Sequence, residues 1–199
     1  MGCDRTENHD KVEFFDTKAK DWDSHLKCNE KLIQAILELS DLKEGMKVLD
    51  IGCGTGVLFN EILKYSPKEI LGVDSSGEMI KKAKEKFQNV KNIRLENKDA
   101  LDVNEDDFDR IFIYNVYPHI IDVEKFEEKL SQICKSGARV TVAHGKGREA
   151  VNNIHAGHHK HISRQLSEVE KEAEIWKKHF SVDILIDNEK TYMFSCVKK

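Results

Sequence analysis

The chain has 199 residues, of which 39% are hydrophobic and 34% charged, so it is long enough to fold as one domain with a sizeable core. Acidic residues outnumber basic ones by 36 to 32, and the net charge of −4 argues against a nucleic-acid-binding surface or attraction to anionic lipid. No apolar run approaches the ~18 residues of a membrane span, and the first residues lack an apolar secretion signal. We expect a globular, cytoplasmic protein.

The five cysteines are odd in number and none has C-x-x-C spacing: Cys3, Cys28, Cys53, Cys134 and Cys196. A disulfide framework or a cysteine-rich zinc module would pair or cluster them, so we expect reduced thiols. The start Met-Gly-x-x-x-Thr fits the pattern for N-myristoylation, with Cys3 as a second acylation site. Because this pattern is short, we expect no membrane attachment.

The first 45 residues are polar and predict two helices, Lys11–Trp22 and Leu26–Leu39. Further along, short apolar runs rich in β-branched and aromatic residues alternate with amphipathic segments, which is typical of strands alternating with helices. The expected strands are Lys47–Ile51, Glu69–Val73, Asn92–Leu95, Phe108–Tyr114 and Ala138–Ala143. The expected helices between them are Val57–Tyr65, Glu78–Phe87 and Val123–Cys134.

Local signals mark the ends of these elements. Ser75, three residues before Glu78, predicts a capping box for the helix that follows. Asp122 is expected to cap the helix that starts at Val123, and Gly137 is expected to end it.

After a helix at Arg164–Phe180, the apolar stretches Val182–Ile186 and Thr191–Val197 flank a polar turn, which predicts an antiparallel hairpin at one edge of the sheet. The expected fold is therefore α/β: a three-layer sandwich with a Rossmann-like, mostly parallel seven-stranded sheet and a C-terminal antiparallel hairpin. In such sheets, ligands bind beyond the carboxyl ends of the strands.

A glycine-rich loop, Asp50–Gly56, lies between the first buried strand and its helix. Its glycines let the backbone turn sharply and approach a ligand where a Cβ would collide. Position 57 is Val, so the spacing is Gly-x-Gly-x-Gly rather than that of a dinucleotide fingerprint, and the Gly-Lys-Ser/Thr sequence of a P-loop is absent. A tight turn without a ligand is the alternative.

Acidic residues follow the next two strands. Asp74 ends the second strand, where its carboxylate can accept hydrogen bonds from both ribose hydroxyls of an adenosine. Its alternative role is to cap the next helix, which Ser75 can already do. Asp99 follows the third strand, where an acceptor can meet an adenine amino group beside apolar contact from Ala100 or Leu101; alone, Asp99 would be a turn residue. Together these residues predict a site for an adenosine-containing ligand.

Four segments in chain order carry a resemblance to a known family: Val48–Gly56, Gly72–Ser76, Lys98–Ala100 and Phe108–Ile113. They resemble successive motifs of class I S-adenosylmethionine (SAM)-dependent methyltransferases, and are most similar to the small-molecule branch typified by menaquinone and ubiquinone C-methyltransferases. The opening Phe14-Phe15-Asp16-x-x-Ala19-x-x-Trp22-Asp23 resembles the N-terminal lid of that branch, and Tyr117–Ile120 lies where many members have Leu-His-His-Ile.

The resemblance implies one methyltransferase domain over residues 1–199. In it, residues 1–45 form a helical lid, 46–143 the SAM-binding core, 144–181 a His-rich substrate-side segment and 182–199 the closing hairpin. Asp50 and the glycines would line the methionine half of SAM, Asp74 would bind the ribose, and Asp99 and Ala100 would hold the adenine. The expected cofactor-binding residues are Asp50, Gly52, Cys53, Gly54, Gly56, Asp74, Ser75, Met79, Asp99, Ala100 and Asn115.

The sequence departs from the family pattern at two points. Cys134–Ala138 replaces the family's usual Leu-Lys-Pro-Gly-Gly, a difference that we interpret as variation within a turn. Asn115-Val116-Tyr117-Pro118 is not the Asn/Asp-Pro-Pro-Tyr motif of enzymes that methylate nucleobase amines. Together with the negative net charge, this predicts a small-molecule acceptor.

An electron-rich acceptor atom can displace the sulfonium methyl of SAM in line, so the enzyme mainly has to align acceptor, methyl and sulfur while excluding water. A phenol, amine or carbon acid often needs a base as well. His119 and Tyr117, just past the fourth strand, are the expected base or substrate contacts. The alternative for both is packing or hydrogen bonding within the fold, and Cys53 is expected to pack without a covalent step.

Five of the nine histidines lie within residues 144–162, directly after the fifth strand. His155, His158 and His159 would share one face of a helix. Together with His144 they are candidate ligands of a divalent metal, Zn²⁺, Ni²⁺ or Fe²⁺, that would bind the acceptor. The alternatives are contacts to an anionic acceptor or a solvated polar segment.

We therefore predict a SAM-dependent methyltransferase that acts on a small molecule by direct in-line displacement, as a monomer or homodimer with no nucleic-acid or membrane partner. A non-catalytic SAM-binding protein is the alternative from another class. A nicotinamide-dependent oxidoreductase is disfavoured by the glycine spacing.

Overall fold

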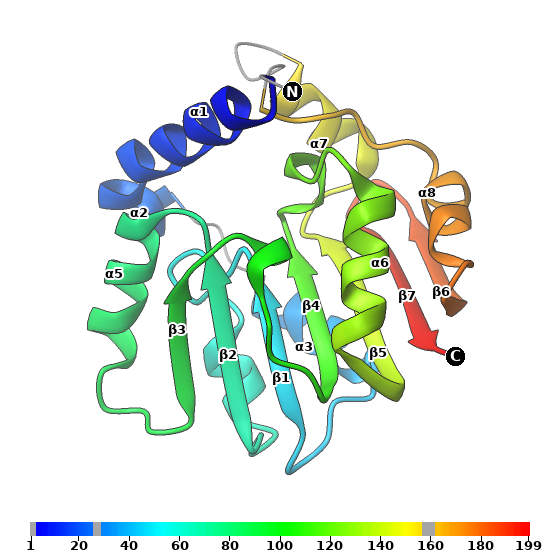
Figure 1. The fold of residues 1–199 in the computed structure, drawn as a ribbon, viewed down its shortest axis with the longest axis horizontal. Coiled ribbons are helices and arrows are strands. Elements are labelled where there is room, and N and C mark those ends of the chain that lie inside the picture. Colours follow the sequence, from blue (N-terminus) through cyan, green and yellow to red (C-terminus); the bar gives the residue numbers. More distant parts are fainter. Residues whose placement is uncertain (1–2, 26–28, 157–161) are drawn as a thin grey trace.

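The computed structural model describes residues 3–25, 29–156 and 162–199 (Figure 1). Its centre is a seven-stranded sheet in the order β3-β2-β1-β4-β5-β7-β6. The strands are β1 (Lys47–Ile51), β2 (Glu69–Asp74), β3 (Ile93–Asn97), β4 (Phe108–Tyr114), β5 (Cys134–His144), β6 (Phe180–Asp187) and β7 (Tyr192–Lys198). The strands β1 to β5 pair in parallel, whereas β7 is antiparallel to both β5 and β6. The predicted sheet and its closing hairpin are confirmed.

Helices cover both faces of this sheet. The α-helices are α1 (Cys3–Lys18), α2 (Trp22–His25), α3 (Glu30–Leu39), α4 (Phe59–Leu63), α5 (Gly77–Phe87), α6 (Val123–Ile133), α7 (Arg148–His155) and α8 (Val169–Trp176), with 3₁₀ turns η1 (Ala19–Asp21), η2 (Ala100–Asp102) and η3 (Tyr117–His119). Buried side chains of α3, α4 and α5 form one core, and those of α6 and α8 form the other. Among the described helices, none combines the length and apolar character that crossing a membrane requires.

Strand β1 contributes to both cores. Val48 packs with α3, α4 and α5, whereas Leu49 and Ile51 pack with α6 and α8. Successive side chains of a strand point to opposite faces, so burial on both faces explains the apolar sequence of β1. Asp50 interrupts that pattern as an acidic side chain inside a buried strand. An exception of this kind points to a functional site rather than to packing.

One of the two predicted helix caps is displaced by a residue. Asp122 accepts a hydrogen bond from Lys125 N at 3.0 Å and caps α6 as predicted. Ser76, rather than Ser75, caps α5, because its extended backbone lets its hydroxyl accept from Met79 N at 3.1 Å.

The junction between α6 and β5 also differs from the prediction. Helix α6 ends at Ile133 and β5 begins at the next residue, so Gly137 does not end the helix. Gly137 has a φ of 76° and lies within β5, where the pairing with β4 changes register. A glycine is suited to such an irregularity because it tolerates this backbone conformation.

The helix predicted at Arg164–Phe180 begins only at Val169. The residues before it form hydrogen bonds with other elements: Arg164 N donates to Pro118 O, and Leu166 N donates to Asn152 Oδ1, both at 2.8 Å. These tertiary bonds take the place of helical ones, which a pattern of apolar residues does not reveal.

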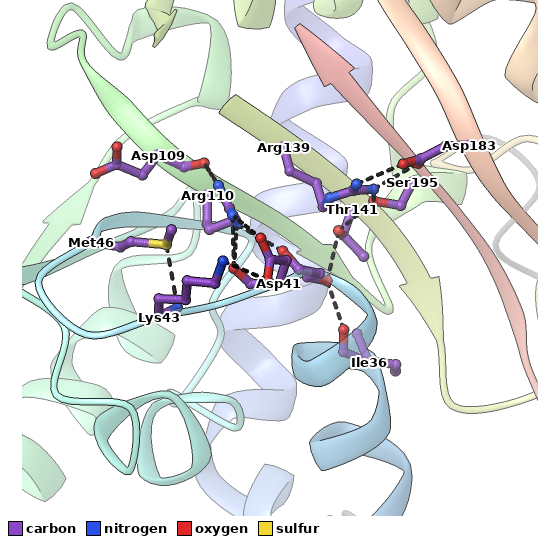
Figure 2. Close-up of polar contacts among 11 residues, drawn as sticks. Ile36, Asp41, Lys43, Met46, Asp109, Arg110, Arg139, Thr141, Asp183 and Ser195 are labelled. Carbon is purple, nitrogen blue, oxygen red and sulfur yellow. Dashed lines mark hydrogen bonds and ion pairs between the residues drawn. The ribbon is translucent and has the colours of Figure 1, made fainter. Parts of the chain in front are cut away.

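A polar network fastens α3 to the sheet (Figure 2). Arg110 on β4 is 7% exposed, and its guanidinium donates to the backbone carbonyls of Ser40 and Asp41, each at 2.7 Å. These carbonyls follow the last turn of α3, where helical partners run out. Beside them, the hydroxyls of Ser40, Thr141 and Ser195 form a chain with oxygen separations of 2.9 Å. The network joins α3 to β4, β5 and β7.

We expect Arg110→Met to lower the free energy of unfolding by about 2–3 kcal/mol, because it leaves partly buried carbonyls without their charged donor. Chemical denaturation of the purified protein measures the change. The control is Lys135→Met, which removes an ion pair with Asp109 at the surface and should change stability by less than ~1 kcal/mol. A loss in Arg110→Met no larger than that of the control would contradict this role.

Candidate functional site

The predicted cofactor residues gather at the edge of the sheet where the parallel strands end. β1 continues into the glycine loop, β2 ends at Asp74, and β4 is followed by Asn115. In Figure 1, α1 and α2 lie above this edge of the sheet. The loops and the N-terminal helices therefore share one end of the molecule.

The glycine loop depends on its glycines. Gly52, Gly54 and Gly56 have φ angles of 65°, 54° and 86°, in the left-handed region that favours glycine. A Cβ at Gly52 would lie 2.4 Å from a methyl carbon of Val116, and one at Gly56 would lie 2.6 Å from the ring of Phe87. The loop is therefore tightly held at both ends, while Gly54 between them has more open surroundings.

Asp74 holds this loop in place. Its Oδ2 accepts a hydrogen bond from Gly54 N at 2.9 Å, and its Oδ1 accepts one from Ser76 N at 2.8 Å. Burial raises the pKa of Asp74, and the two N–H donors partly offset that rise. A carboxylate has about four acceptor positions, so ribose hydroxyls can be added without breaking these two bonds.

The buried carboxyl of Asp50 lacks, among the described residues, a hydrogen-bond donor for one of its oxygens. Its side chain is 1% exposed, and its Oδ2 has no hydrogen-bond partner within the described part of the chain. Burial, and next the charge of Asp74, raise the pKa of the Asp50 carboxyl well above its usual range. A buried acceptor without a donor is unfavourable, so a ligand that supplies a positively charged N–H group would be favoured here.

Three further predicted cofactor residues are Cys53, within the loop, Ser75, which follows β2, and Met79 on α5. Cys53 and Met79 are buried, and Ser75 is partly exposed. Burial raises the pKa of the Cys53 thiol well above its usual range, so this side chain packs as a small apolar group.

The residues predicted to contact the adenine have ordinary local roles in this structure. Asp99 accepts from Leu101 N at 2.9 Å and caps η2, which is the turn role left open by the sequence, and Ala100 is partly exposed beside it. On the opposite side, Asn115 has a φ of 60° and accepts from Gly145 N at 2.9 Å, joining the loops after β4 and β5. Asn115 thus lies at the end of β4, as predicted.

Two aspartates of the N-terminal segment bind the cofactor loops, a role that the sequence analysis missed. Asp16 accepts a hydrogen bond from the hydroxyl of Ser76. Asp23 accepts from the hydroxyl of Thr55 and pairs with Lys86 at 3.0 Å. Both aspartates lie in the lid-like motif, and that resemblance was the signal that could have identified them.

Few apolar side chains hold these N-terminal helices in place. Among the described side chains of residues 9–24, only Ala19 is buried. Phe15 and Trp22 are partly exposed with ring centroids 5.9 Å apart, and the indole nitrogen of Trp22 is 3.8 Å from the Cβ position of Gly54. A segment attached mainly by polar contacts opens at lower cost than one with a buried apolar face, which favours the lid hypothesis.

Tyr117 lies in the core instead of at an accessible site. Its side chain is fully buried, and its hydroxyl accepts from Trp176 Nε1 at 3.0 Å. The guanidinium of Arg164 lies 4.6 Å from the centre of its ring. Burial raises the pKa of Tyr117, so the structure favours the packing role over that of a base.

His119 faces a second histidine, His155. Their Nε2 atoms are 3.3 Å apart and their ring centroids 5.0 Å apart. The Nδ1 atom of His119 is 2.9 Å from Ile162 O, and that of His155 is 2.8 Å from Val151 O. The ring of His119 also packs edge-on against Phe15 at 5.1 Å. His119 therefore lies between the N-terminal segment and α7.

The structure places two of the four predicted metal ligands, and His158 and His159 lie outside the described residues. His144 is buried at the end of β5, and burial, followed by the nearby His155 and His119, lowers the pKa of His144 to about 3. Among the side chains that the structure describes, in residues 9–24, 29–156 and 162–199, no group of three or more His, Cys, Asp or Glu is arranged to hold a metal ion.

The sheet order, the antiparallel hairpin and the glycine loop beside an acidic strand end define a Rossmann-like methyltransferase fold. The methyltransferase domain family matches residues 42–195. The chain belongs to this family. Residues before 42, which include the N-terminal helices, lie outside the match.

Two curated relatives are similar to part of this chain. The mitochondrial ubiquinone biosynthesis O-methyltransferase of Homo sapiens is 31% identical over 105 residues, which cover 49% of this chain and 28% of that protein. The ribosomal RNA small subunit methyltransferase A of Persephonella marina is 36% identical over 85 residues, covering 43% and 32%. The matches span about two fifths or less of the length of the curated relatives.

Solved structures share the fold over nearly the whole chain. A chain of the complex between the Haloferax volcanii Trm112 methyltransferase activator and a methyltransferase has a TM-score of 0.77 at 18% identity, covering 92% of this chain and 97% of that one. The N-methyltransferase NodS of Bradyrhizobium japonicum, in complex with S-adenosylhomocysteine (SAH), has a TM-score of 0.75 at 14% identity, covering 94% and 98%. At these identities the likeness shows the fold alone.

The residues of this chain fit SAM as the cofactor. The unpartnered Asp50 oxygen, at the start of the glycine loop, offers an acceptor for the ammonium of the methionine half. Asp74, already bonded to the loop, retains acceptor capacity for a ribose.

We expect Asp50→Asn to raise the melting temperature of the SAM-free protein at neutral pH and to weaken SAH binding by at least about tenfold, because a charged hydrogen bond contributes ~1.5–3 kcal/mol. The folded-state pKa of Asp50 is raised, so the folded wild type binds more protons than the unfolded chain and loses stability as pH rises through that pKa. The stability gap between variant and wild type should therefore widen from acid to neutral pH.

Thermal melts across that pH range and calorimetric titration with SAH measure both effects. Asp10→Asn, on an exposed residue of α1, is the matched control and should change neither. An Asp50→Asn variant that melts below wild type at neutral pH would contradict the role of a buried, unpartnered charge.

We expect SAH to slow hydrogen exchange across residues 11–22, because the ligand would tighten a segment now held by polar contacts. Asp23→Asn should reduce this protection and weaken SAH binding roughly fivefold, the equivalent of one hydrogen bond. Exchange mass spectrometry with and without SAH measures the change, again with Asp10→Asn as control. Exchange indifferent to SAH would favour a permanently packed helix.

Proposed function

We propose that this chain is a SAM-dependent methyltransferase that transfers a methyl group to a small-molecule acceptor by direct in-line displacement. The observation that carries the proposal is the buried, unpartnered Asp50 oxygen beside a glycine loop that Asp74 holds in place. When bound, SAM supplies an electrophilic sulfonium methyl group. The chain's own residues then bind, orient and shield the reactants.

On the cofactor side, Asp50 would accept from the ammonium of the methionine half and Asp74 from the ribose hydroxyls. The left-handed turns of the glycine loop keep its backbone free of side chains at the closest approach. Ala100 and Asp99, which follow β3, would border the adenine. This arrangement fixes the position of the methyl group, and alignment of the methyl with the acceptor is the largest part of the catalysis proposed.

On the acceptor side, we assign His119 as the contact nearest the reacting centre. It ends η3, the first element after β4, and its ring lies against Phe15 of the N-terminal segment. Phe15 and Trp22 supply apolar surface that would exclude water once the lid closes. Asn115, which joins the loops after β4 and β5, would fix the shape of this side.

The net charge of −4 supports a small-molecule acceptor rather than a nucleic acid. Among the described residues, Cys53, Cys134 and Cys196 are free thiols, which supports the expected cytoplasmic location. We expect a monomer or a homodimer.

We expect Asp74→Ala to weaken binding of both SAM and SAH by about 10- to 150-fold, the equivalent of 1.5–3 kcal/mol for hydrogen bonds to a charged group. Calorimetric titration measures the affinities. Asp183→Ala is the control, because it removes an aspartate of β6 that pairs with Arg139 away from the glycine loop. An unchanged affinity in folded Asp74→Ala would remove this residue from the site.

Wild-type protein that binds neither SAM nor SAH would overturn the proposed function. To separate an enzyme from a non-catalytic SAM-binding protein, SAH production is measured while the protein is supplied with pools of phenols, amines, thiols and carbon acids. Tight SAM binding without turnover on any pool would favour the non-catalytic alternative.

A further inference from the structure

The pair of histidines His119 and His155 has an arrangement that two neutral side chains would not adopt alone. A backbone carbonyl can only accept a hydrogen bond, so the Nδ1 atoms next to Ile162 O and Val151 O both carry protons. In the neutral imidazole the other ring nitrogen then carries a lone pair. The two Nε2 atoms face each other at 3.3 Å, a separation that a shared proton or a bound metal ion would bridge.

The separation suits one metal ion. Two nitrogens bound to Zn²⁺ at about 2.0–2.1 Å in tetrahedral geometry are about 3.3–3.4 Å apart. The observed Nε2–Nε2 distance of 3.3 Å agrees with this value. The pair thus supplies two ligand positions without moving either ring.

The outer hydrogen bonds have the form that metal-binding histidines usually show. Such a histidine donates its second ring N–H to a carboxylate, water or backbone carbonyl, which fixes the tautomer and aims the other nitrogen at the metal. Both histidines do this through Nδ1, at 2.9 Å and 2.8 Å. The bond of His119 reaches a carbonyl 43 positions further along the chain, so the tertiary fold orients this ring. The bond of His155 goes to the carbonyl four residues earlier in α7, so the helix itself orients the second ring.

A third imidazole lies near the pair. The Nε2 atom of His144 is buried and has no hydrogen-bond partner among the described residues. His144 is close enough to His155 and His119 to interact electrostatically with both. A proton shared by the other two histidines would leave this nitrogen without a partner, whereas a metal ion could recruit it.

The surrounding charge permits a cation. The positive charge of Arg164 disfavours a second positive charge near His144. That charge is offset, because the Arg164 guanidinium pairs with Glu172 at 2.7 Å and donates to Ile120 O at 2.9 Å. Because His144 does not complete a three-donor arrangement in the described chain, the two facing nitrogens are the preformed part of the site.

We propose that His119 and His155 are two ligands of a transition-metal site, suited to Zn²⁺, in which His144 or water completes the coordination. The site lies beyond the ends of β4 and β5, on the side assigned to the methyl acceptor. An open coordination position there would bind an anionic oxygen or sulfur atom of a small molecule. That role rests on the proposed function, whereas metal binding itself does not.

The test measures Zn²⁺ affinity of the full chain without a histidine tag, by competition with a chromophoric chelator, and the visible absorption of bound Co²⁺. We expect one equivalent of metal and a tetrahedral Co²⁺ spectrum. His119→Ala and His155→Ala should each weaken Zn²⁺ binding by at least about 100-fold, because loss of a group that merely orients a ligand already costs 10–100-fold. His9→Ala, which removes an exposed histidine of α1, is the matched control.

A second control is the double variant His158→Ala/His159→Ala, which should keep the Zn²⁺ affinity and the Co²⁺ spectrum. Circular dichroism and SAH affinity establish that each variant is folded; His155, half-buried on α7, is the variant that should perturb folding least. The proposal is overturned if the wild type binds no Zn²⁺, if folded His155→Ala binds it as tightly as wild type, or if binding is lost only in the double variant. In each of these cases retained SAM binding would leave the proposed function standing.

Discussion

The carboxylate of Asp74 is the contact on which the site depends. With one oxygen it holds Gly54 of a loop that adopts left-handed backbone angles, and with the other it holds the start of α5. A glycine-rich loop has many conformations available when it is free, and fixing each residue costs roughly 1–2 kcal/mol of backbone entropy. Two hydrogen bonds to a partly buried charge, with close packing at Gly52, restrict the loop to one path.

The same region contains a group that opposes stability. Asp50 lies in the middle of the sheet without a partner for one oxygen, and its burial disfavours the charged form. Val48, Leu49 and Ile51 of β1 are buried and apolar, so the fold supplies enough packing to tolerate this carboxyl. Such conflict between local chemistry and the surrounding core is typical of ligand sites, where the ligand provides the missing interaction.

The two sides of the site are built in different ways. The cofactor side is made of strand ends and backbone N–H groups, which the sheet holds rigidly. The proposed acceptor side consists of the N-terminal helices, η3, α7 and the segment before α8, which meet through polar and ring contacts. The family match begins at residue 42 and therefore leaves out the N-terminal helices. Substrate choice is expected to follow from these less uniform parts.

The sequence by itself determined the sheet and the cofactor side. Buried strands have continuous apolar runs, and the glycine loop and Asp74 lie within a few residues of strand ends, so their relation is fixed by local spacing. Phe108–Tyr114 and Lys47–Ile51 match their predicted bounds for this reason. Only the tertiary structure decided the acceptor side. The predicted base Tyr117 is buried against Trp176, and the start of the last helix moves to Val169 because the preceding residues bond to η3 and α7. His119 and His155 face each other although they are 36 positions apart in the chain. The ring of His119 is oriented by Ile162 O, which is also distant in the sequence, and contacts of this kind leave no periodic pattern.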